Sequence, residues 1–135
     1  VAAVVDAVVG AGGTAVVDVP ASVPITEVVV PRADVLALVV PATVRGLAAA
    51  TRRAAALRRL GGDPVAVVRW PAPGGVTIDD IEFATGLDVV AELPHVRGLA
   101  REIEVDGLGR SVGKLMRPLA PLLDLAGDRD AGHRW

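Results

Sequence analysis

The sequence predicts an α/β domain with a mostly parallel sheet and helices on both faces. Short runs that are apolar throughout, such as DVLALVV and PVAVVR, are typical of strands buried on both sides. These runs alternate with longer segments that show helical periodicity and end at glycine. With 135 residues, of which 52% are hydrophobic, the chain is long enough to bury one core but not two.

The first third of the chain predicts a short helix, two strands and a connecting turn. Residues 1–10 can form a helix that stops at the glycines that follow it. In the stretch TAVVDVP, Thr14–Val19 is predicted to be a buried strand because β-branched residues favour the extended conformation. The stretch VPITEVVVPRA favours a connecting helical turn, since Pro31 could not donate a ladder hydrogen bond. Residues 34–40 are predicted to form the next strand, which Pro41 ends.

Residues 43–60 contain the clearest helical pattern. One face is expected to hold Val44, Leu47, Ala48, Leu57 and Leu60, and the opposite face the arginines at 45, 52, 53, 58 and 59. Two glycines close this helix, and residues 64–69 give a third strand.

The last part of the chain predicts three further helical segments and one strand. Thr77 caps a helix that has Asp79 and Asp80 in its first turn and Gly86 as its stop. The remaining elements are a strand over 88–93 that Pro94 ends, a short helix over 97–105, and an apolar segment over 111–126. Two prolines in that segment, Pro118 and Pro121, argue against one long helix. Helical structure folded back onto the sheet or onto a partner is favoured over a membrane anchor.

Composition excludes several classes of protein. The 14 basic and 16 acidic residues give a net charge of −2, so there is no electrostatic reason to expect a nucleic-acid partner. The absence of cysteine rules out disulfides and thiolate metal sites and makes a cytoplasmic location the expected one. The opening VAAVVDAVVGAGG carries an acidic residue and no basic lead, unlike a signal peptide, and no apolar run reaches the roughly 18 residues of a membrane span.

The carboxyl ends of the strands are the expected position of a ligand site. Asp18 follows its predicted strand there and is either a carboxylate on the magnesium side of a site or the cap of the next turn. His95 has no carboxylate nearby in the sequence to orient it and is interpreted as a surface histidine, while His133 belongs to a polar tail, DRDAGHRW, over residues 128–135. Lys114 lies in GLGRSVGKL, which has Leu108 where a phosphate-binding loop needs glycine and Leu115 where it needs a hydroxyl residue.

Residues 1–110 resemble the second half of the MinD/ParA group of P-loop ATPases, in particular its CpaE-like branch. TAVVDVP is similar to the strand that carries the Walker B or switch II aspartate, and ADVLALVVPATVRGLAAATR to the strand and helix that follow it. The longer stretch PVAVVRWPAPGGVTIDDIEFATGLDVVAELPHVRGLA resembles the next strand, loop, helix and strand, and its Pro-Ala-Pro-Gly-Gly loop is the most particular match. The resemblance implies two parts: residues 1–110 as the carboxyl-terminal half of an α/β domain, and residues 111–135 as a terminal helix and polar tail.

The resemblance also implies roles for individual residues. Asp18 would be the Walker B or switch II aspartate, and Arg69, Trp70, Pro94 and His95 would lie in the loops beside the nucleotide base. Relatives usually have asparagine where this chain has Arg69 and Trp70, so selectivity for adenine is open. The parent family uses ATP and magnesium, whereas this chain lacks the phosphate-binding loop and is expected to bind neither alone.

In the family, the phosphate-loop strand lies between the Walker B strand and the strand that follows it. Without it, the strand of Asp18 must pair directly with residues 34–40, or the sheet keeps an unpaired edge. Because the chain starts on Val1 inside what is predicted to be an element, we expect its beginning to be missing.

Two main functional hypotheses follow, with a third behind them. The first is a fragment of a CpaE/MinD-like ATPase, inactive alone, associated with septum-site determination or with pilus or secretion assembly. Homodimerisation and division, pilus or secretion proteins as partners are implied by the family, while peripheral membrane contact is not favoured. The second is a stand-alone protein-interaction module that no longer uses nucleotide. The third is an unrelated α/β enzyme with Asp18 and the Gly74, Gly75 loop as its assets.

Overall fold

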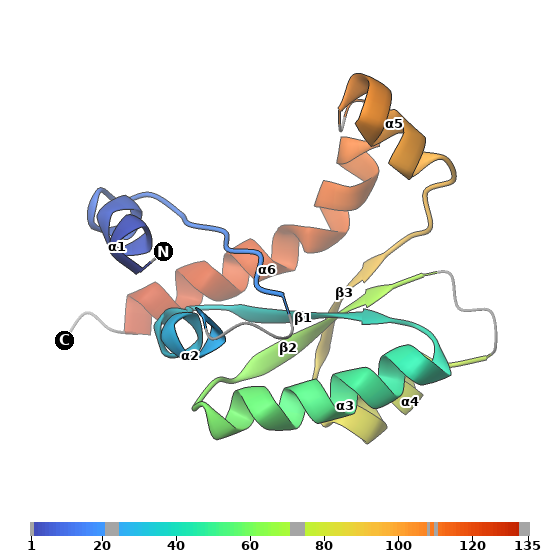
Figure 1. Ribbon diagram of the computed structural model, residues 1–135, viewed down its shortest axis with the longest axis horizontal. Helices are drawn as coiled ribbons and strands as arrows, with labels where there is room; N and C mark the ends of the chain where they lie inside the picture. Colours follow the sequence, from blue (N-terminus) through green and yellow to red (C-terminus); the bar gives the residue numbers. More distant parts are fainter. Residues whose placement is uncertain (1, 21–24, 71–74, 108, 110, 133–135) are drawn as a thin grey trace.

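The computed structural model describes residues 2–20, 25–70, 75–107, 109 and 111–132. Its elements are α1 (Ala2–Gly10), α2 (Ile25–Val29), the 3-10 turn η1 (Val30–Arg32), β1 (Leu36–Pro41), α3 (Val44–Arg59), β2 (Pro64–Arg69), α4 (Ile78–Thr85), β3 (Val89–Leu93), α5 (Leu99–Asp106) and α6 (Val112–Gly132). The fold is α/β, as predicted, with helices on both faces of a parallel sheet (Figure 1).

The described sheet has three strands in the order β1-β2-β3. Both pairs are parallel, and α3 and α4 provide the crossovers between them. A register shift between Ala66 and Val67 marks an irregularity in the β2–β3 pair. β2 lies in the centre, where both of its edges are paired, and four of its six residues are buried.

The main core lies between the sheet and the layer formed by α3 and α4. Its buried members are Val40, Ala42, Ala50, Ala54, Ala66, Val68, Val76, Ile81 and Leu87. Four of these nine are alanine, whose small side chain allows the helices to approach the strands closely. Burial of a residue the size of Ile81 contributes about 1.5–3 kcal/mol to folding.

Local signals define α3 and α4 as predicted. Thr43 and Thr77 are the N-caps, and each side-chain oxygen accepts a hydrogen bond from a backbone N–H of the first turn. In α4, Asp80 completes a capping box by accepting from the N–H of Thr77 at 2.8 Å. Gly86 ends α4 with a φ of 63°, which favours glycine.

The inward face of α3 differs from the prediction. Ala50, Ala54 and Leu57 are buried, whereas Val44 is 72% exposed and Ala48 is exposed. Leu57 was predicted to face inward and does so, whereas the prediction missed Ala50 and Ala54, whose small side chains allow the helix to lie close to the sheet.

The predicted strand Thr14–Val19 is wrong. Residues 13–20 belong to no helix or strand of the structure, and Val16 is 92% exposed. Ala15, Val17 and Val19 are half-buried while the residues between them are exposed. This alternation is typical of an extended backbone, which β-branched residues favour, and it turns every second side chain toward the rest of the molecule. A strand also requires a hydrogen-bonded partner, and in the described part of the chain β1 pairs with β2 alone. Of the two alternatives, direct pairing with residues 34–40 and an unpaired sheet edge, the described residues show the second, since no strand pairs with the outer edge of β1.

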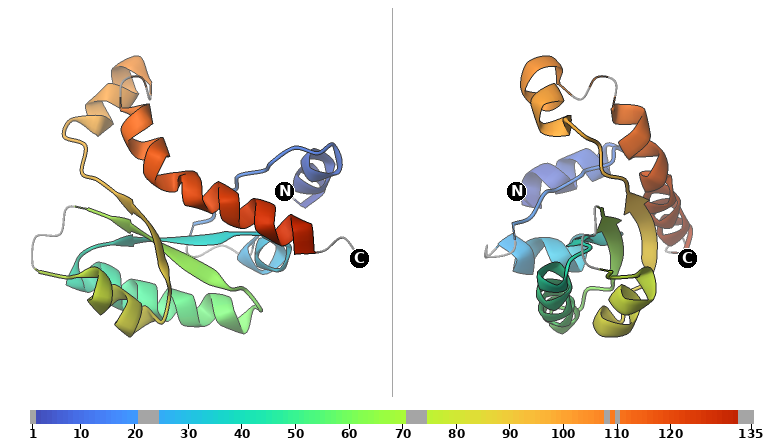
Figure 2. Two further views of the ribbon diagram at one scale, coloured as in Figure 1. Left: turned by 180° about the vertical axis from the view of Figure 1, so that it is seen from behind. Right: turned by 90° about the vertical axis from the view of Figure 1, so that its right-hand side faces the viewer.

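α6 covers the second face of the sheet. It packs against β3 and is half-buried at 115, 119, 122 and 126, one turn apart (Figures 1 and 2). The expected fold-back is therefore confirmed, but the prediction that prolines would prevent one long helix is wrong. Pro118 and Pro121 remove hydrogen bonds to the carbonyls of Lys114 and Arg117, and both of these residues are exposed. The helix bends instead of breaking, as Figure 1 shows.

The polar tail expected at the end of the chain begins later than residue 128. Residues 128–132 continue α6, while His133 and Trp135 lie outside the described residues. No helix in the described ranges is both long and apolar enough to cross a membrane.

Candidate functional site

The carboxyl ends of the three strands lie level with one another. Pro41, Arg69 and Leu93 are partners in register across β1, β2 and β3. Two backbone hydrogen bonds extend this alignment by one residue: the N–H of Ala42 donates to the carbonyl of Arg69, and that of Trp70 to the carbonyl of Leu93, both at 3.0 Å. The chain segments that follow the strands therefore start at the same edge, as expected for a site of an α/β sheet.

The four residues expected beside a nucleotide base meet at this edge. Arg69 ends the central strand, Trp70 follows it, and Pro94 and His95 follow β3 directly. Arg69, Pro94 and His95 are exposed, so their side chains are accessible from the carboxyl edge. The rest of the Pro-Ala-Pro-Gly-Gly loop, residues 71–74, lies outside the described residues.

Trp70 is tied into the structure. Its ring packs against the main core, and its indole N–H donates to the Glu92 carboxylate, with 3.0 Å between Nε1 and Oε2. A half-buried indole usually finds such a partner because an unpaired N–H would cost free energy. Trp70 therefore joins the ends of β2 and β3, and Arg69 is the more available side chain for a ligand.

The N-terminus of α3 also opens at the carboxyl edge. Thr43 accepts from the N–H of Gly46 at 3.0 Å through its side chain and from the N–H of Leu47 at 2.8 Å through its carbonyl. Gly46 lies so close to Pro41 that an added Cβ would be 3.0 Å from the carbonyl carbon and still nearer the carbonyl oxygen. The close approach at Gly46 thus fixes the start of α3 against the end of β1.

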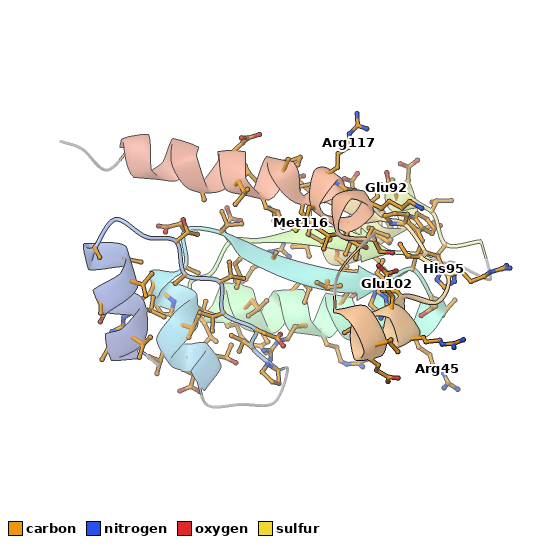
Figure 3. All side chains as sticks on the ribbon, turned by 90° about the horizontal axis from the view of Figure 1, so that it is seen from above. Arg45, Glu92, His95, Glu102, Met116 and Arg117 are labelled. Atoms are coloured by element: carbon orange, nitrogen blue, oxygen red, sulfur yellow. The ribbon has the colours of Figure 1, made fainter. Side chains whose placement is uncertain are left out.

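Figure 3 labels Arg45 from α3, Glu92 from β3 and His95 from the segment after it toward the end of the sheet where the strands finish. Glu102 belongs to α5, which lies on the opposite side of the sheet from α3 (Figure 1). Glu102 holds the start of α6, accepting from the N–H of Ser111 at 2.9 Å and from its hydroxyl at 2.6 Å. Ser111 is 6% exposed, so this junction is fixed.

Asp18 is not delivered by a strand. It is an exposed residue in the segment between α1 and α2, and within the described residues no hydrogen bond joins it to any of the four base-side residues. Lys114 lies in the first turn of α6, and α5 precedes it, whereas a phosphate-binding loop follows a strand. The structural context therefore agrees with rejecting GLGRSVGKL as such a loop.

At the N-terminus of α4, which follows the carboxyl end of β2, hydrogen bonds from the backbone and then the side chain of Thr77 lower the pKa of the Asp80 carboxyl. Among the described residues, no group of three His, Asp or Glu side chains is placed to hold a metal ion.

Glu92, Glu102 and Gly46 were not identified from the sequence. Glu92 could have been found, because it lies one residue before the end of β3, beside the predicted end of β2 that carries Trp70. Glu102 and Gly46 gave no such signal, since their roles depend on contacts with Ser111 and Pro41 that no sequence pattern indicates.

Two curated proteins of Mycobacterium tuberculosis are similar to this chain. They are "Uncharacterized protein MT3760" of strain CDC 1551 / Oshkosh and "Uncharacterized protein Rv3660c" of strain ATCC 25618 / H37Rv, each 34% identical over 107 residues. The match covers 78% of this chain and 31% of each relative, so the chain spans about a third of the length of the relatives it matches. No family model matches the chain, and no solved structure matches it significantly.

Proposed function

We propose that this chain is the carboxyl-terminal portion of a MinD/ParA-type ATPase of the CpaE-like branch. In this role it supplies the base-side loops with Arg69, Trp70, Pro94 and His95, and another part of the ATPase supplies the phosphate-binding half. The parent ATPase would use ATP and magnesium in the cytoplasm and act, as a dimer, in septum-site determination or in pilus or secretion assembly.

The open edge of β1 carries this proposal. Val39 is 53% exposed, although its register partner Val67 on the neighbouring strand is 1% exposed. Within the described residues the outer edge of β1 has no partner strand, which leaves backbone groups free to pair. A sheet that continues past β1 would cover both, and the relatives, of which this chain spans 31%, contain the additional length.

Hydrolysis of ATP requires a phosphate-binding loop, which the 135 residues do not contain. Phosphoryl transfer depends on positioning and on charge stabilisation by a glycine-rich loop, its lysine and magnesium. Lys114 is the one lysine of the 135 residues. It lies in the first turn of α6, which follows the helix α5, whereas the lysine of a phosphate-binding loop follows a strand. We therefore expect the isolated chain to be inactive.

The test is calorimetric titration of the chain with magnesium ATP, with the Asp18→Ala chain as its control. We expect no saturable heat from either chain and phosphate release at the rate of buffer alone. Saturable binding that disappears in the Asp18→Ala chain would contradict the proposal, because Asp18 would then complete a site without the phosphate-binding loop.

A stand-alone interaction module is the second candidate, and exposed apolar side chains favour it. Phe83 of α4 is 94% exposed and Val44 of α3 is 72% exposed. Reading the coding DNA upstream of Val1 separates the two candidates. An in-frame loop of glycines with a lysine supports the ATPase portion, and a stop codon followed by a ribosome-binding site supports the module.

A further inference from the structure

The outer surface of α3 is a continuous basic stripe. Among the 16 residues of α3 are five arginines and no acidic residue. Arg45, Arg52 and Arg59 are exposed and seven residues apart, which is almost two helical turns, so they lie in one row about 10 Å from one another. The buried residues Ala50, Ala54 and Leu57 are on the other side of the helix, and the row therefore points away from the core.

The outer surface of α4 is acidic and aromatic. Asp79 and Phe83 are four residues apart on one face, and Ile81 and Thr85 are buried on the other. Phe83 is the only phenylalanine of the chain and is 94% exposed. A large aromatic side chain at such exposure is typical of a residue that a partner covers.

α3 and α4 lie side by side in one layer. The hydroxyl of Thr51 donates to the carbonyl of Ala84 at 3.3 Å, and Arg58 Nη1 donates to the carbonyl of Thr85 at 3.0 Å. The right-hand view of Figure 2 shows both helices on the same face of the sheet. The layer thus exposes a basic row and, next to it, an acidic and aromatic row.

We propose that this layer binds a second copy of the chain, with α3 of each copy on α4 of the other. A two-fold axis parallel to the two helices places the basic row of each copy over the acidic and aromatic row of the other. Both copies then use the same surface, so the contact is isologous. Arginine of one copy then faces Asp79 and Phe83 of the other, which combines charge pairing with a cation–π contact. The exposed alanines Ala48, Ala49 and Ala55, beside the arginines, allow the partner helix to approach.

Charge favours a second copy over other occupants. The five arginines of α3 leave nine basic and sixteen acidic residues in the rest of the chain, so the remainder carries a net charge of −7 and attracts the basic row of another copy. A membrane surface would instead require large apolar side chains between the arginines, where this helix has alanine.

The experiment is sedimentation equilibrium of the 135-residue chain over a wide range of concentration, at low and high salt. We expect a dimer whose dissociation constant rises with salt, because exposed charges are screened. Arg52→Glu should raise that constant at least tenfold, and so should Phe83→Ala. Arg101→Glu is the matched control, since it reverses an exposed arginine on α5 and should leave the constant unchanged.

A double charge reversal tests the pairing itself. The chain with both Arg52→Glu and Asp79→Arg should dimerise nearly as tightly as the unchanged chain, because opposite charges again face each other across the axis. Far-UV circular dichroism of each variant checks that it is folded. A wild-type chain that stays monomeric overturns the proposal, as does a dimer insensitive to Arg52→Glu. A monomer that binds anionic vesicles or DNA through Arg52 also overturns it and makes that anionic surface the occupant.

Discussion

Gly46→Ala is expected to destabilise the fold, although alanine is the better helix former. Gly46 lies in the first turn of α3, where replacement of glycine by alanine would by propensity add about 1 kcal/mol of stability. The added Cβ, however, would lie 3.0 Å from the carbonyl carbon of Pro41 and 3.1 Å from its Cβ, and closer still to the carbonyl oxygen. These contacts involve backbone and a rigid ring, so the helix must move as a whole.

The balance of the two effects gives the magnitude. Overpacking of this kind costs about 1–3 kcal/mol or more. The shift also disturbs the hydrogen bond from the Gly46 N–H to the Thr43 hydroxyl, a cap contact of about 1 kcal/mol. After the gain from propensity is subtracted, we expect a net loss of roughly 1–3 kcal/mol in the free energy of unfolding.

Gly113→Ala is the matched control for this experiment. Gly113 is also a helical glycine, in α6, and no atom lies within 4 Å of the Cβ that alanine would add. The assay is urea unfolding, monitored by far-UV circular dichroism, of the unchanged chain and the two variants. The dependence of the unfolding free energy on urea concentration is compared among the three chains. Gly113→Ala should gain up to about 1 kcal/mol while Gly46→Ala loses stability. Equal gains in both variants would refute the packing of α3 against the end of β1.

Three further substitutions test the local contacts of the layer and the carboxyl edge. Arg58→Met keeps the aliphatic stem but removes the hydrogen bonds to the last carbonyls of α4, and should cost about 1–3 kcal/mol in urea unfolding. Asp80→Asn removes a carboxylate whose pKa Thr77 lowers below the ordinary 3.8. The lowered pKa stabilises the fold above the unfolded-state value and not below the folded-state value, so the difference between the two chains in urea midpoint should shrink as pH falls through that range. Trp70→Phe leaves Glu92 without its indole partner and should lower stability by about 1 kcal/mol at neutral pH, measured in the same way.

Elements with complete local signals could be predicted from the sequence. β2 was predicted over its observed bounds, and α4 was predicted with Thr77 as its cap and Gly86 as its stop. α4 needs no distant partner to define its ends, since the capping side chain of Thr77 and the left-handed Gly86 lie at its two ends. The α/β class followed from the alternation of strands and helices.

Features that depend on distant parts of the chain could not be predicted in this way. Residues 14–19 have the composition of a strand, but composition cannot supply the neighbouring strand that would turn an extended segment into part of a sheet. In α6, the cost of Pro118 and Pro121 depends on whether their orphaned carbonyls face water, which is known only once the exposed side of the helix is known. The same holds for the candidate site, where Trp70 was identified but its tie to Glu92 was not.

The open edge of β1 and the exposed layer of α3 and α4 are two different surfaces, and each can be covered without the other. An additional strand at β1 would pair with backbone groups in the plane of the sheet, whereas a second copy on the layer would cover Phe83 and the arginine row outside that plane. Neither event removes the surface that the other needs. An ATPase completed at β1 could therefore still dimerise through α3 and α4, and a chain that dimerises in this way would still have an unpaired edge. The nucleotide titration and the sedimentation experiment consequently test the two proposals independently.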